Sequence, residues 1–304
     1  MTEVRKAQVR VPCSTSNLGS GFDTLGLALN RYLVASFRPG GHTLEVEFAG
    51  TLDLLEGPPE DDFLVSVFSA EMERAGVRPL GALHLWSEVP VARGLGSSAA
   101  ALVAGFELAR AVLGKSSDQE GAFRQAAARE GHGDNAAPCA LGGLRGVVAG
   151  SNGPRPLLLS LSDEVGFAYA APAKGVSTAA ARAALPGQVA HAVAVAQLGR
   201  MTALLRGLAE GDPKLIRVGI EDELHVPHRL PLIVHGERAM SAGYEAGAWG
   251  VTISGSGSGL LAVCSPDDAP AVAAAMREVF DAGAGDPGCV GFALSPDFEG
   301  AVHL

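Results

Sequence analysis

The sequence predicts an α+β fold in two domains, and three observations support this prediction. In the first half, three strand-like segments precede the first helical periodicity, giving the order β–β–β–α–β–α–α. The tail, residues 251–295, follows the order β–β–α–β, which is typical of a ferredoxin-like α/β sandwich. A length of 304 residues suits one large or two medium domains. We therefore expect a domain boundary at residue 155, with domains at 1–155 and 156–304.

The composition and net charge of the chain indicate which classes of binding partner are not expected. Hydrophobic residues make up 47% of the chain, which is enough for a large core, and the formal net charge is −10. Without a basic run, nucleic acid and anionic membranes are not expected partners. An acidic protein that binds phosphate must do so with local dipoles and a metal cation. No apolar leader core and no apolar run of 18 residues is present, so we expect a soluble cytoplasmic protein. The four cysteines are far apart in sequence and are expected as buried free thiols.

The N-terminal third begins with an alternating strand over residues 4–12 that we expect to end at Pro12. Ser, Asn and Gly then crowd residues 13–24, a turn composition, and they include the polar candidates Asn17 and Asp23. The alternative role for both side chains is to satisfy the backbone of the turn. Residues 32–38 and 43–49 alternate, which predicts a hairpin around Gly40 and Gly41, followed by a loop and then a helix over 63–76.

Residues 90–105, PVARGLGSSAAALVAG, are the stretch around which the first domain is organised. A strand is predicted over residues 83–89, and Pro90 ends its pairing because proline has no N–H to donate. Glycines and serines follow, and residues 99–114 have helix-forming composition throughout. Unpaired N–H groups and the macrodipole at the start of that helix make an anion site, best suited to a phosphate.

The spacing of the glycines and serines in this loop is also compatible with interpretations other than a phosphate site. GLGSSA (94–99) is close to a dinucleotide-binding fingerprint, but Pro90 and the late position in the chain argue against it. A Walker A loop is excluded because no lysine follows the glycines. A glycine turn closed by an N-capping serine, with no ligand, stays open on spacing alone.

Function-capable side chains also gather after the predicted helix at 118–130. Glu130 closes that helix, where the dipole disfavours an acid, which suggests that a cation offsets it. A metal ligand fits this position, and a solvated helix-end carboxylate is the commoner alternative. His132 has no second His or Cys at ligand spacing, so a zinc site is not predicted.

Beyond residue 144 the pattern gives three strands, over 145–150, 155–161 and 165–170. A short helix with Ser177 or Thr178 as its cap carries Arg182, and a long apolar helix follows over 190–212. Arg229 comes after Pro227. For a single arginine the usual role is surface solubility, and that alternative stays open for Arg182 and Arg229.

Three motifs in this order resemble the GHMP kinase superfamily: PCSTSNLGSGFDTLGLAL (12–29), PVARGLGSSAAA (90–101) and ISGSGSG (253–259). Within it the chain resembles the homoserine kinases, through SNLGSGFDTLGLAL (16–29), EGHGDNAAPCALGG (130–143), VSTAAARAALP (176–186) and VPHRLPLI (226–233). The chain departs from the family pattern at Ser258, where a proline is usual, and at Val226, where an acid is usual.

The resemblance implies a two-domain GHMP kinase fold, with an N-terminal domain like ribosomal protein S5 domain 2 and a ferredoxin-like C-terminal domain. It implies ATP-dependent phosphorylation of the L-homoserine hydroxyl in threonine biosynthesis. The residues it assigns to ATP are Pro90, Val91, Ala92, Arg93, Gly94, Leu95, Gly96, Ser97, Ser98, Ala99 and Ala100. Ser98 and Glu130 match the positions that coordinate Mg²⁺ and, with Asn135, are the expected catalytic residues.

The homoserine pocket implied by the resemblance consists of Asn17, Asp23, His132, Asp134, Arg182 and Arg229, with the glycine loop Gly255, Ser256 and Gly257 beside it. Two guanidinium groups suit an α-carboxylate, and Asp23 suits an α-ammonium. Another small-alcohol GHMP kinase, such as a mevalonate kinase, and a non-catalytic GHMP-like binding module are the alternatives. We also expect a homodimer, with its interface through the C-terminal domain.

Overall fold

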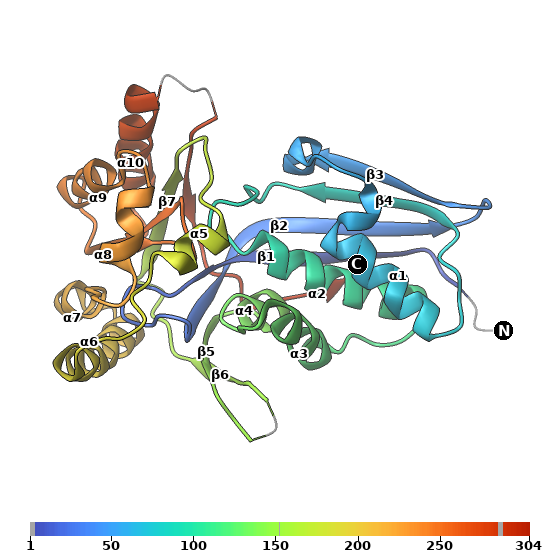
Figure 1. Ribbon diagram of the computed structural model, residues 1–304, viewed down its shortest axis with the longest axis horizontal. Coiled ribbons are helices and arrows are strands. Elements are labelled where there is room, and N and C mark those ends of the chain that lie inside the picture. The colour runs from blue at the N-terminus through green and yellow to red at the C-terminus, as the bar shows by residue number, and fades with distance from the viewer. Residues whose placement is uncertain (1–3, 152, 285–287) are drawn as a thin grey trace.

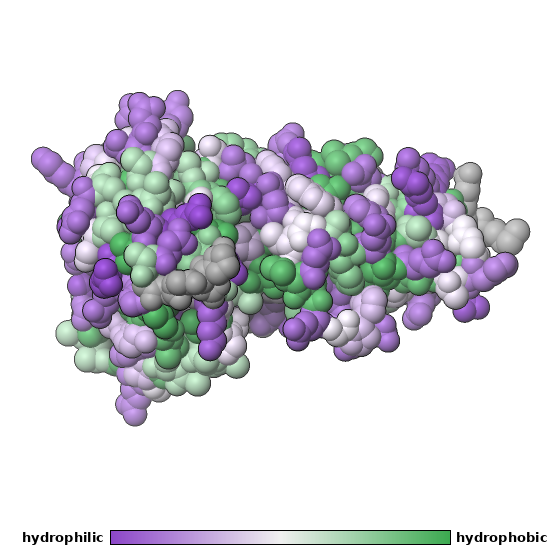
Figure 2. Space-filling view, turned by 90° about the horizontal axis from the view of Figure 1, so that it is seen from above, coloured by the Kyte–Doolittle hydropathy of each residue, from purple (hydrophilic) through white to green (hydrophobic). Residues whose placement is uncertain are grey.

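The computed structural model describes residues 4–151, 153–284 and 288–304, and it has two lobes side by side along the long axis (Figure 1). The C-terminus lies on the first lobe (Figure 1). Asn152, within the loop predicted between two strands, lies outside the described residues. From above, polar and apolar residues are interspersed over an elongated surface (Figure 2).

Among the described residues, seven strands form the sheet of the first lobe, in the order β11-β1-β2-β4-β3, with β5 and β6 continuing from the other end of β2. They are β1 (Ala7–Ser16), β2 (Leu25–Pro39), β3 (Leu44–Gly50), β4 (Gly81–Ser87), β5 (Leu144–Val148), β6 (Arg155–Leu159) and β11 (Val302–His303). β2 can join two sub-sheets because it is 15 residues long. It pairs with β4 through residues 33–39 and with β5 through residues 25–27.

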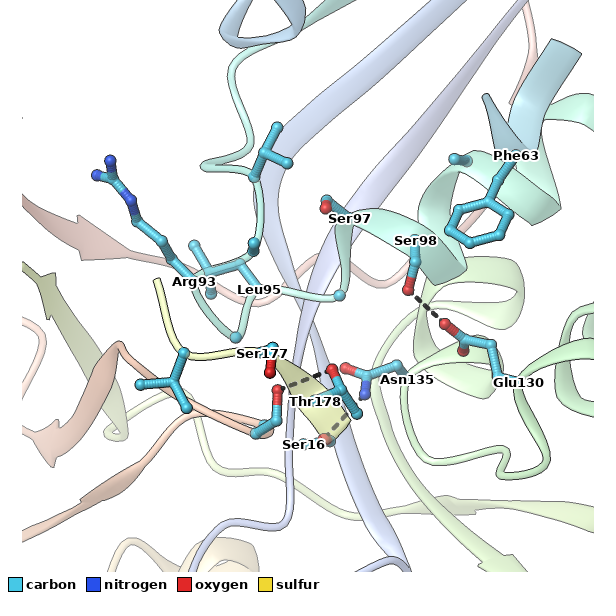
Figure 3. A pocket seen from close by; sticks show the side chains of 18 of the residues that line it. Ser16, Phe63, Arg93, Leu95, Ser97, Ser98, Glu130, Asn135, Ser177 and Thr178 are labelled. Carbon is cyan, nitrogen blue, oxygen red and sulfur yellow. Dashed lines mark hydrogen bonds between the residues drawn. The ribbon is translucent and has the colours of Figure 1, made fainter. Parts of the chain in front are cut away.

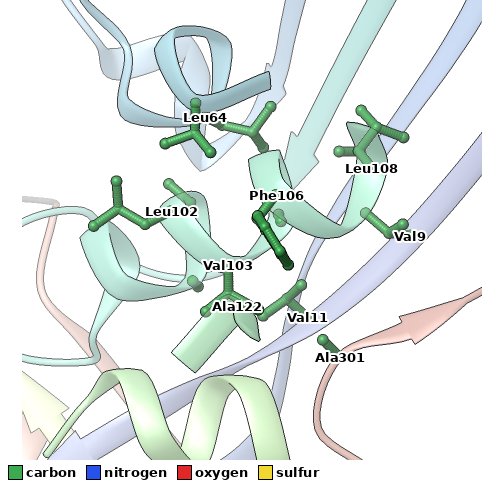
Figure 4. Close-up of a cluster of buried hydrophobic side chains, with 14 of the residues drawn as sticks. Val9, Val11, Leu64, Leu102, Val103, Phe106, Leu108, Ala122 and Ala301 are labelled. Atoms are coloured by element: carbon green, nitrogen blue, oxygen red, sulfur yellow. The ribbon is translucent and has the colours of Figure 1, made fainter. Parts of the chain in front are cut away.

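Helices cover one face of this sheet: α1 (Phe63–Arg74), α2 (Ser97–Val112), α3 (Gln119–Glu130) and α4 (Ala136–Leu141). α2 is the central helix, and it is buried on almost every side between the sheet and the other helices (Figure 4). Its small residues permit this packing, since a Cβ on Gly105 would lie 2.7 Å from the Leu64 carbonyl oxygen of α1. The start of α2 is therefore held firmly at the edge of the lobe.

The second lobe has a four-stranded antiparallel sheet in the order β10-β7-β9-β8. Its strands are β7 (Gly166–Ala171), β8 (Gly250–Ile253), β9 (Leu260–Cys264) and β10 (Val290–Leu294). Alternate residues of β7 face opposite layers. Phe167 and Tyr169 pack with residues of α6 (His191–Glu210) and α7 (Pro213–Gly219), and Ala168 and Ala170 pack with those of α9 (Gly236–Glu245) and α10 (Ala269–Ala284). Burial on both faces explains why β7 reads as a continuous apolar run.

Short elements complete the chain: α5 (Thr178–Ala183), α8 (Val226–Arg229) and the 3₁₀ turns η1 (Thr51–Leu54), η2 (Pro59–Asp61) and η3 (Leu230–Leu232). The α+β class expected from the sequence is confirmed. The four cysteines are buried free thiols, as predicted. Of the helices in the described ranges, none is long and apolar enough to cross a bilayer.

The predicted hairpin at residues 32–38 and 43–49 is wrong. β4 lies between these strands, antiparallel to β2 and parallel to β3. A parallel pair needs a crossover connection, and α1 lies in the segment between β3 and β4 that supplies it. Alternation along the sequence shows that both strands form but not which strand each one pairs with.

Other element boundaries also differ from the sequence prediction. β1 continues through Pro12 to Ser16, because a register irregularity between Pro12 and Cys13 leaves a place where no ladder donor is needed. The sequence prediction missed α4, α7, α9 and the short β11. α4 contains Pro138 two residues after its start, where the missing N–H costs little.

Candidate active site

A cleft of about 430 Å³ lies between the lobes and contains most of the predicted site residues. The first lobe contributes the end of β1, the loop before α2 and the segment between α3 and α4. The second lobe contributes the segment around α5, Arg229 and the loop between β8 and β9. Loops from both lobes therefore line one cleft (Figure 3).

The loop before α2 presents backbone N–H groups to this cleft. Gly96 is the N-cap with a left-handed φ of 63°, and no side chain caps the helix start. The alternative of an N-capping serine is therefore wrong, because Ser97 and Ser98 are already the first helical residues. The first N–H groups of α2 have no intrahelical partner and lie where an anion can accept them.

The second lobe fixes the position of this loop. The Ser254 hydroxyl donates to the Gly94 carbonyl at 2.6 Å, and a Cβ on Gly94 would lie 2.0 Å from the Ser254 carbonyl oxygen. The Arg93 guanidinium donates to the Ala173 and Gly288 carbonyls, both at 2.7 Å, so its charge is directed to backbone and away from the cleft. The loop is thus tied to both lobes.

Ser98 and Glu130, which were predicted as a metal pair, lie next to each other in the structure (Figure 3). Ser98 is in the first turn of α2, and Glu130 is the last residue of α3. The Ser98 hydroxyl donates to Glu130 Oε1. Glu130 Oε2 is buried and has no hydrogen-bond partner among the described residues. Burial raises the pKa of this carboxyl above its ordinary value, against the effects of Ser98 and His132. An unpartnered buried carboxylate oxygen beside the start of α2 fits a hard cation.

Across the described ranges, no cluster of three or more His, Cys, Asp or Glu side chains forms an all-protein metal cage. Mg²⁺ sites in phosphoryl-transfer enzymes generally use one or two protein groups and complete the shell with phosphates and water. The donor set Ser98 and Glu130 fits that pattern.

His132 and Asp134 form a dyad at the cleft wall. His132 Nδ1 lies 2.7 Å from Asp134 Oδ1, and Asp134 is buried. The hydrogen bond to Asp134 raises the pKa of His132, and burial opposes this rise only in part. The Asp134 carboxylate is therefore already engaged by a neighbouring ring.

Asp23 and Arg182 face each other as a bidentate ion pair. Arg182 Nη1 and Nη2 donate to the two carboxylate oxygens of Asp23 at 3.0 and 3.1 Å, and the hydrogen bond to Asp23 raises the pKa of Arg182. Asn17 supports the carboxylate's backbone, since its Oδ1 accepts the Asp23 N–H at 2.9 Å and its Nδ2 donates to the Gly255 carbonyl at 2.7 Å. The Asn17 side chain therefore hydrogen-bonds to the backbone of the turn, which is the alternative role considered for it above, and it also lines the cleft.

Arg229 is buried, so the surface-solubility alternative is wrong for this residue. Its Nε donates to the Ala181 carbonyl at 3.1 Å, its Nη1 donates to the Gly255 carbonyl at 3.3 Å, and its guanidinium lies 5.1 Å from the Phe22 ring centroid. Burial lowers its pKa, although an arginine remains charged at neutral pH. Arg182 and Arg229 therefore place two positive charges near Asp23 and Asp134 in one end of the cleft.

The other end of the cleft is apolar and, apart from Val91, was not predicted as part of the site. Its lining includes Leu33, Leu52, Leu55, Phe63, Leu64, Leu85 and Val91, together with Asp62 and Ser87. The Phe63 ring faces this end of the cleft and is 55% exposed (Figure 3). Asp62 N-caps α1 through the N–H groups of Leu64 and Val65. Nothing in the sequence linked this end of the cleft to a ligand.

Not every residue in the predicted set lines the cleft. Val91, Ala92, Arg93, Gly94, Leu95, Gly96, Ser97 and Ser98 do, and so do Gly255 and Ser256. Pro90, Ala99, Ala100 and Gly257 are not part of its lining. Ala99 and Ala100 are fully buried behind the loop as part of the helix core.

Comparisons with known proteins agree with this architecture. A family model described as GHMP kinases N terminal domain matches residues 62–143, and one described as GHMP kinases C terminal matches residues 204–282. A curated homoserine kinase of Synechococcus sp. (strain CC9605) is 39% identical over 91% of this chain and 90% of its own length. One of Prochlorococcus marinus (strain MIT 9303) is 38% identical over 91% of this chain and 90% of its own length.

Solved structures give the same result for the fold. The homoserine kinase of Cytophaga hutchinsonii superposes with a TM-score of 0.85 at 27% identity, covering 98% of this chain and 97% of that one. The L. major mevalonate kinase in complex with R-mevalonate superposes with a TM-score of 0.71 at 15% identity, covering 97% and 99%. The second likeness concerns the fold alone.

Proposed function

The chain belongs to the GHMP kinases and, within them, to the homoserine kinases, and from this premise we propose that it transfers the γ-phosphoryl group of ATP to the side-chain hydroxyl of L-homoserine. The product is O-phospho-L-homoserine. The observation that carries the proposal is that a phosphate-binding helix start and a charged Asp23–Arg182–Arg229 cluster line one cleft. Such a cluster suits an amino acid better than an uncharged alcohol.

ATP is assigned to the loop before α2 and to the apolar end beyond it. The free N–H groups of α2 suit the phosphates, and the apolar lining around Leu52 and Phe63 suits a purine base. Ser98 and Glu130 would hold Mg²⁺. When bound, that ion neutralises charge on the phosphates.

The homoserine α-ammonium and α-carboxylate are assigned to Asp23 and to the two arginines. In this structure Asp23 and Arg182 neutralise each other. A zwitterion can take the place of each partner, because its ammonium replaces the guanidinium at Asp23 and its carboxylate replaces Asp23 at Arg182. A hydroxy acid without the ammonium would leave the Asp23 charge without a partner, so we expect such compounds to bind poorly.

The chemical step relies on positioning and charge, with no general base in our assignment. Phosphoryl transfer passes through a loose transition state in which early removal of the hydroxyl proton gains little. Asn135 carries no proton-accepting group of suitable pKa, and Asp134 is bonded to His132. We assign Asp134 to substrate binding and expect the proton to leave late, to a phosphoryl oxygen.

Arginine variants test the substrate end. Arg229→Ala should raise the homoserine KM about ten- to a hundredfold and leave the ATP KM within about twofold, because a charge-assisted contact is lost. Arg182→Ala should raise it less, since the same change also removes the guanidinium that competes for Asp23. Steady-state kinetics with each substrate varied separately give both constants.

Arg124→Ala is the matched control, because Arg124 is an exposed helix residue that pairs with Glu120 outside the cleft. Thermal unfolding of each variant identifies loss of structure, which is a risk for buried Arg229. An unchanged homoserine KM in both cleft variants would remove these residues from the site.

The proposed function is tested by ADP release over a panel of alcohols: L-homoserine, 4-hydroxybutyrate, R-mevalonate and L-serine. We expect homoserine to exceed 4-hydroxybutyrate and R-mevalonate in kcat/KM by at least about a hundredfold, because both lack the ammonium that pairs with Asp23. It should exceed L-serine by about tenfold or more, because serine has both charges but its hydroxyl is one methylene closer to them. Preference for mevalonate would establish another small-alcohol kinase. No turnover with any alcohol, together with normal ATP binding, would establish a binding module.

A further inference from the structure

A hydrogen-bonded network beneath the phosphate loop holds the Asn135 side chain from two sides. The Ser14 hydroxyl donates to Asn135 Oδ1 at 3.0 Å, and Asn135 Nδ2 donates to Ser16 Oγ at 3.0 Å. Both serines are on β1 and point to the same face, because they are two residues apart in a strand. Neither serine belongs to the site predicted from the sequence.

The network also selects one orientation of the amide. The Cys139 thiol donates to Ser14 Oγ at 3.2 Å, and the Ser14 hydroxyl has two acceptors on Asn135, the side-chain Oδ1 at 3.0 Å and the backbone carbonyl at 3.3 Å, of which Oδ1 is the nearer. The oxygen end is thereby assigned to Ser14 and the nitrogen end to Ser16. One Nδ2 hydrogen is then used by Ser16. The other has no acceptor among the residues described, and Asn135 lines the cleft.

The network is in direct contact with the phosphate loop. A Cβ on Gly96 would lie 2.3 Å from Ser14 Oγ and 2.9 Å from Asn135 Oδ1, and the Ser14 N–H donates to the Leu95 carbonyl at 3.2 Å. Any rotation of the Asn135 amide would therefore move a group that touches the helix N-cap. Figure 3 shows Asn135 between Ser16 and the Ser98–Glu130 pair.

We propose that Ser14 and Ser16 are positioning residues that lock the Asn135 amide so that its second N–H points into the cleft as a fixed donor for an oxygen of the transferring phosphoryl group. The inference rests on the proposed function, which assigns phosphoryl transfer to this cleft. A donor fixed before the reaction stabilises charge that develops in the transition state without reorganising. An amide free to rotate would present its oxygen to the phosphoryl group for part of the time.

The test is a double-mutant cycle with Asn135→Ala. Ser16→Ala and Ser14→Ala should each lower kcat about three- to tenfold and leave both KM values within about twofold, because the lost hydrogen bond serves the transition state. In the Asn135→Ala background the same substitutions should change kcat by less than about 1.5-fold, because nothing remains to be positioned. Ser16→Thr keeps a hydroxyl and should restore most of the activity.

Ser20→Ala is the control, since Ser20 is a buried serine of the neighbouring turn whose hydroxyl has no partner within the described ranges. If Ser14→Ala is unfolded by thermal melting, Ser16→Ala carries the test. The proposal is overturned if the serine variants keep full kcat while Asn135→Ala loses activity, or if their effects persist undiminished in the Asn135→Ala background. Full activity of Asn135→Ala also overturns it, whereas absence of homoserine turnover in the unmutated protein would refute the proposed function itself.

Discussion

Glu130→Gln is expected to lower kcat about 10²- to 10³-fold, which is typical for loss of one electrostatic contact in a transition state. The substitution keeps the size of the side chain and an oxygen that can accept the Ser98 hydroxyl, but it removes the negative charge from a buried carboxylate. If Mg²⁺ binds there, its apparent affinity should fall with the charge. Steady-state kinetics at increasing Mg²⁺ concentration measure both effects.

Glu120→Gln provides the control on the same helix. Glu120 is exposed and pairs with Arg124 at 3.3 Å, so its substitution should leave kcat and the Mg²⁺ dependence unchanged.

The raised pKa of Glu130 adds a pH dependence with a definite sign. As pH falls toward that pKa, protonation competes with the cation, so the Mg²⁺ requirement should increase in acid. A Glu130→Gln variant with kcat near wild type would separate this carboxylate from catalysis.

Gly96→Val is expected to abolish detectable ATP binding in a protein that still folds. Gly96 has a φ of +63°, which a β-branched residue rarely adopts. Its added Cβ would also meet Ser14 Oγ at 2.3 Å, so the loop would have to leave the position in which its N–H groups converge. Isothermal titration calorimetry with a non-hydrolysable ATP analogue measures binding, and circular dichroism checks the fold.

Gly76→Val separates backbone strain from the clash. Gly76 follows α1 with a φ of +73°, but no atom lies within 4 Å of its added Cβ. This variant should lose some stability and bind the nucleotide normally. If Gly96→Val also bound ATP normally, the triphosphate would lie elsewhere.

The sequence predicted the elements that have strong local signals. The glycine-rich stretch before α2 could be located because the strand, Pro90, the glycines and the helical run follow one another directly. The helix-dipole argument for Glu130 pointed to a cation, and the structure supplies Ser98 as the neighbouring donor. Local composition and helix-end chemistry therefore indicated the end of the cleft at which we propose that the phosphates bind.

Features that depend on distant partners could not be predicted in this way. The insertion of β4 between β2 and β3 and the return of β11 to β1 are set by packing, which periodicity does not report. Asp23 and Arg182 are 159 positions apart, and their pairing is visible only in the fold. The apolar end of the cleft was missed because leucines from β2, β4 and η1 each look like ordinary core residues.

We infer that this cleft transfers phosphoryl groups by positioning and charge, without a side-chain base. Single-turnover transfer in Asp134→Asn, with ATP and homoserine both saturating, distinguishes this mechanism from general-base catalysis. We predict a chemical rate within about threefold of wild type and a weaker homoserine affinity, because the loss is one of substrate binding. Abolished transfer in a variant that still binds homoserine normally would identify Asp134 as the base and rule out a base-free mechanism.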